Sequence, residues 1–121
     1  MEPRRVESWG RLHREAVSIE PESGIVYMTE DRADGCFYRH IPDDPAQPMG
    51  SGRLQALCIP GVAVSDPYPE PVEGKIPPVI WSEGQRWDVK WVDIDDRHAE
   101  SMACRHQAQA RGGTHDQGFR F

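Results

Sequence analysis

The sequence predicts an all-β protein of antiparallel strands, with one short helix near the C-terminal end. Short runs of β-branched and aromatic residues recur between Glu15 and Ile59, with turn-forming residues between them. Eleven prolines and eleven glycines among 121 residues require many turns and leave little room for long helices. One stretch, "RHAESMACRHQAQAR" (residues 97–111), is free of both and rich in Ala, which favours a helix there.

The first two predicted strands flank a tight turn. Residues 15–20 alternate, with Val17 and Ile19 on one side of the strand. Pro21-Glu22-Ser23-Gly24 is typical of a turn, because Pro presets φ and Gly accepts positive φ. "GIVYMT" follows and is apolar on both faces, as in a central strand.

Three more strands are expected after this one. "DRADG" is a second turn and "CFYRHI" the next strand, so residues 25–41 should form a hairpin. "RLQALCI" is a fourth strand, and "WDVKWVDI" a fifth with Trp87, Val89 and Trp91 on one side. Residues 60–86 between them carry six prolines and predict a long irregular connection. The end, "GGTHDQGFRF", has no clear structure.

Four consecutive short strands with tight turns are typical of one blade of a β-propeller, although a sandwich would have a similar pattern. One blade cannot bury both faces of its sheet, so further blades should accompany it. The fold prediction is therefore an antiparallel β-propeller fragment. Residues 1–121 would form one partial domain, with about one blade and part of a second.

Charge and composition argue against several classes of protein. The net charge is −6, from 14 basic and 20 acidic residues, and no basic stripe is interleaved with aromatics, so nucleic acid is an unsuitable partner. The sequence has no apolar run of 18 residues, so no membrane span is predicted. "MEPRRVESWG" contains Arg4-Arg5 without an apolar stretch behind it, so no secretory signal is expected. Cys36, Cys58 and Cys104 predict neither a disulfide framework nor a structural zinc site.

Glu15 stands in line with Val17 and Ile19, and an acid on the apolar side of a strand is costly unless something binds it. Glu30, Asp31 and Asp34 follow around a turn, with a spacing that can wrap a hard cation, although Asp is also an ordinary turn residue. We expect the Glu15 carboxylate on the same face as Val17 and Ile19, near Glu30 or Asp31. Metal binding and plain turn formation both remain open at this point.

Other candidate groups are weaker. Asp93, Asp95 and Asp96 lack the Gly and the distal Glu of an EF-hand loop, so they are interpreted as solvated charges. The spacing of His98, Cys104 and His106 does not suit one zinc-binding helix face. Arg14 is interpreted as a surface arginine rather than a phosphate contact.

A longer pattern resembles a known family. "HREAVSIEPESGIVYMTEDRADGCFYRHIP", followed by "GRLQALCI" and "WVDIDD", is similar to the PhoX-type alkaline phosphatases of bacteria. The similarity is dense over residues 15–59 and resumes over residues 91–96, which is about half of the chain.

The resemblance implies a six-bladed propeller with a calcium and iron cluster that hydrolyses phosphate monoesters, in enzymes exported to the periplasm or beyond. Glu15 matches the metal-binding glutamate of the family's His-Glu-Ala-Val element. Glu30 and Asp31 match its acidic Thr-Glu-Asp turn, so the resemblance implies that Glu15, Glu30 and Asp31 are metal ligands.

The sequence also departs from the family pattern. Arg14 stands where the family has a His, and His13 is displaced by one position. None of the three cysteines matches the iron-binding cysteine, and no glutamate of a Phe-x-Arg-x-Glu-Gly element follows "RHQAQARGG". The resemblance therefore implies an internal fragment with an incomplete metal site and no activity alone.

Two further hypotheses stay open beside a fragment of a metal-dependent phosphoesterase. One is a non-catalytic propeller segment that acts as a ligand-binding or interaction module. The other is a degenerate reading-frame product that barely folds. Carboxylates that converge in space would favour the metalloenzyme, and scattered ones would favour the binding module.

Overall fold

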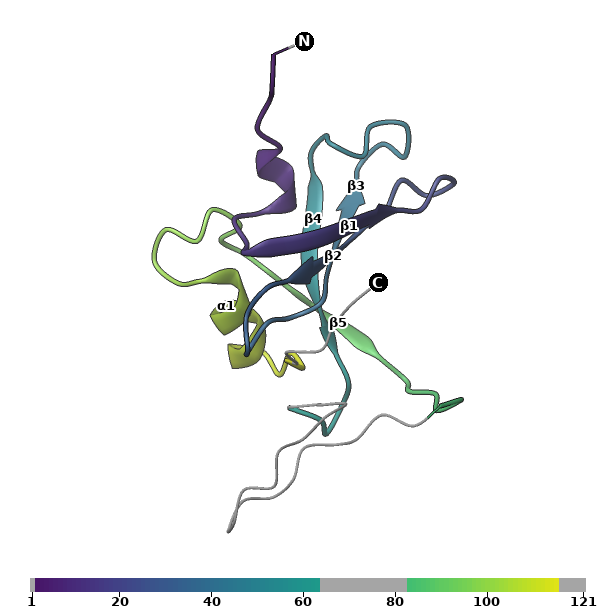
Figure 1. Ribbon diagram of the computed structural model, residues 1–121, viewed down its shortest axis with the longest axis vertical. Coiled ribbons are helices and arrows are strands. Elements are labelled where there is room, and N and C mark those ends of the chain that lie inside the picture. Colours follow the sequence, from purple (N-terminus) through teal and green to yellow (C-terminus); the bar gives the residue numbers. More distant parts are fainter. Residues whose placement is uncertain (1, 64–82, 116–121) are drawn as a thin grey trace.

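A computed structural model describes residues 2–63 and 83–115, and in these residues five strands form one antiparallel sheet in the order β1-β2-β3-β4-β5 (Figure 1). All-β architecture with one short helix is confirmed. The elements in chain order are η1 (Glu7–Trp9), β1 (Arg14–Ile19), β2 (Val26–Glu30), β3 (Tyr38–Pro42), β4 (Gly52–Cys58), β5 (Lys90–Asp93) and α1 (Cys104–Ala110).

The strands pair in sequence order, as the turn signals predict. Val26 of β2 lies opposite Ile19 of β1 and His40 of β3, and Tyr38 lies opposite Ala56 of β4. The first turn closes through a hydrogen bond from Gly24 N to Glu20 O. The register of β1 against β2 shifts between Arg14 and Val17, so a bulge interrupts the strand that contains Glu15.

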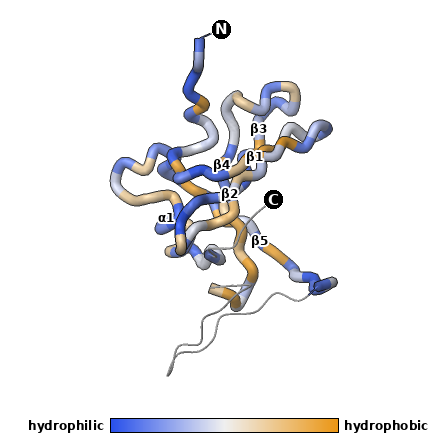
Figure 2. Tube along the Cα trace, in the orientation of Figure 1, coloured by the Kyte–Doolittle hydropathy of each residue, from blue (hydrophilic) through white to orange (hydrophobic). Residues whose placement is uncertain are grey.

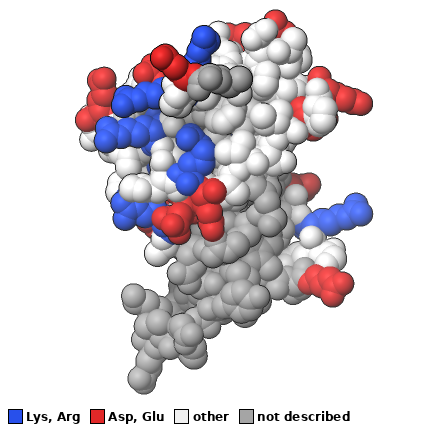
Figure 3. Space-filling model, turned by 45° about the horizontal axis from the view of Figure 1, so that its top comes forward, with Lys and Arg blue, Asp and Glu red and all other residues white. Residues whose placement is uncertain are grey.

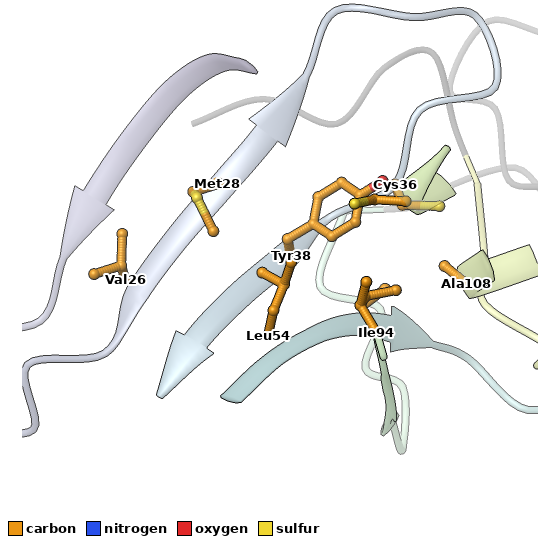
Figure 4. Packing of buried hydrophobic residues seen from close by; sticks show 9 residues of the cluster. Val26, Met28, Cys36, Tyr38, Leu54, Ile94 and Ala108 are labelled. Carbon is orange, nitrogen blue, oxygen red and sulfur yellow. The ribbon is translucent and has the colours of Figure 1, made fainter. Parts of the chain in front are cut away.

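One face of the sheet carries the hydrophobic core. Alternate residues of β2 and β3 point to this face, because successive side chains of a strand lie on opposite sides. Figure 4 shows these side chains beside residues of β4 and α1. The buried cluster consists of Val26, Met28, Cys36, Tyr38, Leu54, Ala56, Ile94, Cys104 and Ala108.

The opposite face carries an aromatic cluster of Tyr27, Phe37 and Trp91, whose ring centroids lie 6.1–6.4 Å apart. The guanidinium of Arg39 lies 4.1 Å from the Trp91 ring centroid, a cation–π contact. All four side chains are half-buried. Since β5 pairs directly with β4, the described strands belong to one open sheet, and its identity as a propeller blade stays a prediction.

The helix begins later than the sequence pattern indicates. Ala-rich composition predicts a helix over residues 97–111, but Ala99 has a φ of 52° and α1 starts only at Cys104. The Asp96 carboxylate accepts hydrogen bonds from the backbone N–H groups of Glu100 and Ser101, which holds this stretch as a loop. Local side-chain bonding therefore overrides helix propensity here.

Two other boundaries differ from expectation. The fifth strand begins at Lys90, not at Trp87. Residues 112–115 of the tail are held against the sheet: Thr114 is fully buried, its N–H donates to Leu57 O, and its hydroxyl donates to Val62 O. Most of the predicted irregular connection, residues 64–82, lies outside the described residues. None of the described helices has the length and apolar character needed to cross a membrane.

The N-terminal segment (residues 5–11) lies against the sheet and is predominantly hydrophilic (Figure 2). Trp9 Nε1 donates a hydrogen bond to Pro48 O at 2.8 Å. Arg14 donates to Trp9 O and Gly10 O at 3.1 and 2.8 Å, and Arg97 donates to Ser8 O at 2.8 Å. Hydrogen bonds of two arginines and one tryptophan thus fix this segment, and Trp9 also packs against the hydrophobic core.

Candidate functional site

Glu30 ends β2 on the core side of the sheet and is only 5% exposed. Its Oε1 atom accepts hydrogen bonds from the Tyr38 hydroxyl at 2.8 Å and from Cys36 N at 3.3 Å. Its Oε2 atom accepts a hydrogen bond from His13 N at 3.4 Å. Both oxygens of this buried carboxylate therefore have donors within the chain, as a buried charge requires.

Arg14 lies opposite Glu30 in the β1–β2 register. Burial lowers the pKa of Arg14, while Cys104 and Glu30 nearby raise it. Arg14 Nε also contacts Met28 Sδ at 3.3 Å, and its Nη2 binds the N-terminal segment. Arg14 is not a surface arginine as expected: its side chain is half-buried and supplies positive charge near Glu30.

Two cysteines border the same carboxylate as neutral thiols. Burial, reinforced by Glu30, raises the pKa of Cys36 to about 12 and that of Cys104 to about 11. Burial also raises the pKa of Tyr38, so its hydroxyl stays protonated and can donate to Glu30. Because the thiolate is the reactive form of cysteine, neither thiol is activated as a nucleophile at neutral pH in the metal-free chain.

A cavity of about 330 Å³ opens beside Glu30. It lies between the start of β1 and the start of α1, and His13, Arg11, Cys104 and Arg105 are among its lining residues. A buried carboxylate beside a cavity with cationic side chains makes this the candidate site.

The three predicted metal ligands lie in different environments. Glu30 is buried, whereas Glu15 and Asp31 are exposed. Val17 and Ile19 are 38% and 41% exposed, so the apolar side of β1 is only partly covered. Glu15 is exposed because β1 is an edge strand of the sheet, and the expected approach of its carboxylate to Glu30 or Asp31 stays a prediction.

The described residues do not fit a calcium and iron cluster. Within residues 2–63 and 83–115, no group of three or more His, Cys, Asp and Glu side chains is placed to hold a metal ion. The most buried candidate, Glu30, already binds three donors of the chain. Ligation by Glu15, Glu30 and Asp31 together with residues from elsewhere stays a prediction.

The remaining acids of the predicted clusters have structural partners. Asp34 pairs with Arg105 Nε at 3.0 Å and His106 Nε2 at 3.5 Å, which ties the β2–β3 loop to α1. Burial works against ionisation of Asp34, but Arg105 and hydrogen bonds outweigh it and lower the pKa of this carboxyl. Asp95 pairs with Arg111.

The sequence pattern indicates Glu30 as a candidate residue but not the groups that surround it. The alternation of "VYMTE" places Glu30 on the same face as Val26 and Met28, which is a signal that it would be buried. No pattern pointed to Arg105, which is distant in the chain and lines the same cavity, or to the hydroxyl of Tyr38, which lies on the next strand.

The fold and the site define an antiparallel β protein with a buried, hydrogen-bonded carboxylate beside a polar cavity. The sequence model of the family described as "Alkaline phosphatase PhoX" matches residues 1–118. The chain therefore belongs to the PhoX alkaline phosphatase family. No curated protein and no solved structure gave a match.

Proposed function

We propose that this chain is one part of a PhoX-type phosphoesterase, and that it does not hydrolyse phosphate monoesters by itself. Residues 1–121 would form a partial propeller domain that acts on phosphate esters only together with further blades. The observation that carries the reaction class is the family match over residues 1–118.

The sheet supports a role within a larger β assembly. Blades of a propeller are antiparallel sheets in which consecutive strands pair, and β1 to β4 have this order. The aromatic cluster of Tyr27, Phe37 and Trp91 lies on the face opposite the core, where a neighbouring sheet would pack.

The candidate site supports inactivity of the chain alone. The Glu30 carboxylate already accepts hydrogen bonds from three donors of the chain. Metal catalysis of phosphoryl chemistry needs ligands that converge on an ion, and the described residues contain no such group.

The test is a phosphatase assay on the purified 121-residue chain with p-nitrophenyl phosphate, in the presence of Ca²⁺ and Fe³⁺. We expect no turnover above that of the metal ions without protein. Glu15→Gln is the informative variant, and Glu22→Gln, at an exposed turn position, is its matched control.

Turnover by the chain alone that Glu15→Gln abolishes and Glu22→Gln preserves would overturn the proposal. Turnover that appears only when further blades are added, and that is again lost in Glu15→Gln, would support it.

A further inference from the structure

His40 stands in the middle of β3, and its side chain is fully buried on the core side of the sheet. The residues opposite it, Val26 of β2 and Leu54 of β4, are apolar and buried as well. His40 Nε2 lies 3.0 Å from the carbonyl oxygen of Gly50. A carbonyl only accepts hydrogen bonds, so Nε2 carries the proton of the neutral imidazole and Nδ1 is the bare nitrogen. Among the described residues, Nδ1 has no hydrogen-bond partner.

The β3–β4 loop (residues 43–51) connects this imidazole to the N-terminal segment. Three consecutive carbonyls of the loop each accept a hydrogen bond from a side chain. The donors are Trp9 Nε1 to Pro48 O, Ser8 Oγ to Met49 O and His40 Nε2 to Gly50 O, at 2.8, 2.8 and 3.0 Å. Figure 1 shows the loop at one end of the sheet, next to the turn between β1 and β2. Because neighbouring peptide groups hold the ring and the segment, a change at one should reach the other.

Two charged groups act on the ring. Burial lowers the pKa of His40 and the positive charge of Arg97 lowers it further, while the hydrogen bond to the loop and the carboxylate of Asp43 raise it only in part. Arg97 is held in place, because it donates to Gly52 O at 2.7 Å and to Ser8 O at 2.8 Å. A proton on the ring is therefore opposed by burial and by a fixed positive charge.

Further charged residues of the surrounding elements lie away from the ring or in water. Glu30 is on the core side too, but at the far end of β2 from Val26, which faces His40. Arg39 and Arg53 stand on the opposite face, because successive residues of a strand alternate. The exposed charged residues of η1 and the loop are Glu7, Asp43 and Asp44. Figure 3 shows charged side chains at the surface of one face, where water screens them.

We propose that His40 is an acid sensor: when Nδ1 takes up a proton, the β3–β4 loop and the N-terminal segment move away from the sheet. The charged ring has a second N–H donor without an acceptor in a buried, apolar place, which costs free energy. Opening the loop lets water reach this donor, whereas moving β3 breaks its pairing with both β2 and β4. The loop yields first, because most of its residues are exposed.

The direction of the pH dependence follows from the lowered pKa of His40. Once water reaches the ring, its pKa returns toward the ordinary value of 6.5, so the open state takes up the proton at a higher pH than the closed state. The closed state is therefore fully stabilised above pH 6.5 and loses stability as the pH falls toward its own lower pKa. Since one proton is linked to opening, the open fraction should rise by up to about tenfold per pH unit in this range.

The test is amide hydrogen exchange of the 121-residue chain at pH 7.5 and 5.5, corrected for the intrinsic effect of pH on exchange. We expect the amides of the segment and the loop to lose protection by about tenfold at pH 5.5, while those of β2 and β3 keep theirs. The reporting amides have backbone hydrogen bonds and belong to Gly10, Arg11, Asp43, Gln47 and Gly50. Both pH values lie above the ordinary pKa of Asp and Glu, so the carboxylates change little.

His40→Gln is the deciding variant, because a glutamine amide can donate to Gly50 O but takes up no proton in this range. The loss of protection at pH 5.5 should disappear in it. His98→Gln, at an exposed histidine, is the matched control and should behave like the unchanged chain. Nuclear magnetic resonance of the unchanged chain gives a second measurement that needs no variant. The ¹⁵N shifts of the His40 ring should report its protonation at the same pH at which the loop opens.

An unchanged pH dependence in His40→Gln would overturn the proposal. Protonation of His40 without a change in the loop would overturn it as well. An equal loss of protection in β2 and β3 would also count against it, because the acid would then unfold the whole sheet and not release one loop.

Discussion

Glu30 brings a carboxylate to the core side of the sheet, where three donors of the same chain bind it. One of these donors, the Tyr38 hydroxyl, comes from the next strand and is fully buried. A buried charge that loses a donor retains its desolvation cost without compensation. The pair Glu30–Tyr38 should therefore matter for stability.

Tyr38→Phe should lower the free energy of unfolding by about 1–3 kcal/mol, because Glu30 Oε1 loses its shortest hydrogen bond. Urea unfolding followed by fluorescence or circular dichroism measures this. Tyr27→Phe is the control, since Tyr27 is half-buried on the opposite face and no hydroxyl bond is described for it. Equal stabilities of the two variants would contradict a stabilising role for the Glu30–Tyr38 bond.

The three cysteines should differ sharply in reactivity. Cys36 and Cys104 are buried, and their pKa values are raised to about 12 and 11. Cys58 is half-exposed. Because reaction proceeds through the thiolate, Ellman's reagent at pH 8 should modify one thiol per folded chain quickly and all three after denaturation.

Cys58→Ser should remove the fast phase of that reaction. If the rate of the fast phase were unchanged in this variant, the assignment of buried and accessible thiols would be wrong.

At the scale of elements, the turn between β1 and β2 depends on close contact with another loop. Gly24 has a φ of 69°, and a Cβ atom there would meet the carbonyl oxygen of Pro45. Gly61 has a similar φ of 80°, but a Cβ atom there would meet nothing within 4 Å. Substitution of Gly61 therefore adds only backbone strain, whereas substitution of Gly24 adds backbone strain and a steric overlap.

Gly61→Ala should cost about 1 kcal/mol of stability, the strain of positive φ alone. Gly24→Ala should cost a further 1–3 kcal/mol or so, because the loop containing Pro45 must move. Chemical denaturation of both variants tests the difference. A Gly24→Ala variant as stable as Gly61→Ala would show that the two loops do not press together in solution.

At the scale of the whole molecule, the described sheet is open and β1 forms one of its edges. This strand carries Val17 and Ile19, both partly exposed to water. Unpaired edges with apolar side chains favour pairing with another chain, and charged residues at the edge prevent it.

Val17→Lys should therefore reduce self-association of the 121-residue chain, measured by size-exclusion chromatography with light scattering over a range of concentrations. Ala46→Lys, at an exposed position of the loop between β3 and β4, adds the same charge without altering a residue of β1 and should have a smaller effect. If both variants reduced association equally, net charge rather than the β1 edge would govern it.

Strand order, hairpin pairing and both early turns follow from the sequence alone. Strands with alternating apolar residues and turns with Pro or Gly are determined by residues close together in the chain. The pattern over residues 15–59 also pointed to the PhoX family, which the match over residues 1–118 confirms.

Only the tertiary structure decided how the charged side chains are used. Asp34 pairs with Arg105, 71 positions away, and the bonds of Arg97 to Ser8 and Gly52 span comparable distances along the chain. The burial of Thr114 likewise depends on a distant partner, Ile59, whereas the late start of α1 follows from hydrogen bonds of Asp96 to residues just after it in the chain. Periodicity predicts which side of a strand faces the core, but a carboxylate becomes buried, paired or exposed according to the donors that folding brings to it.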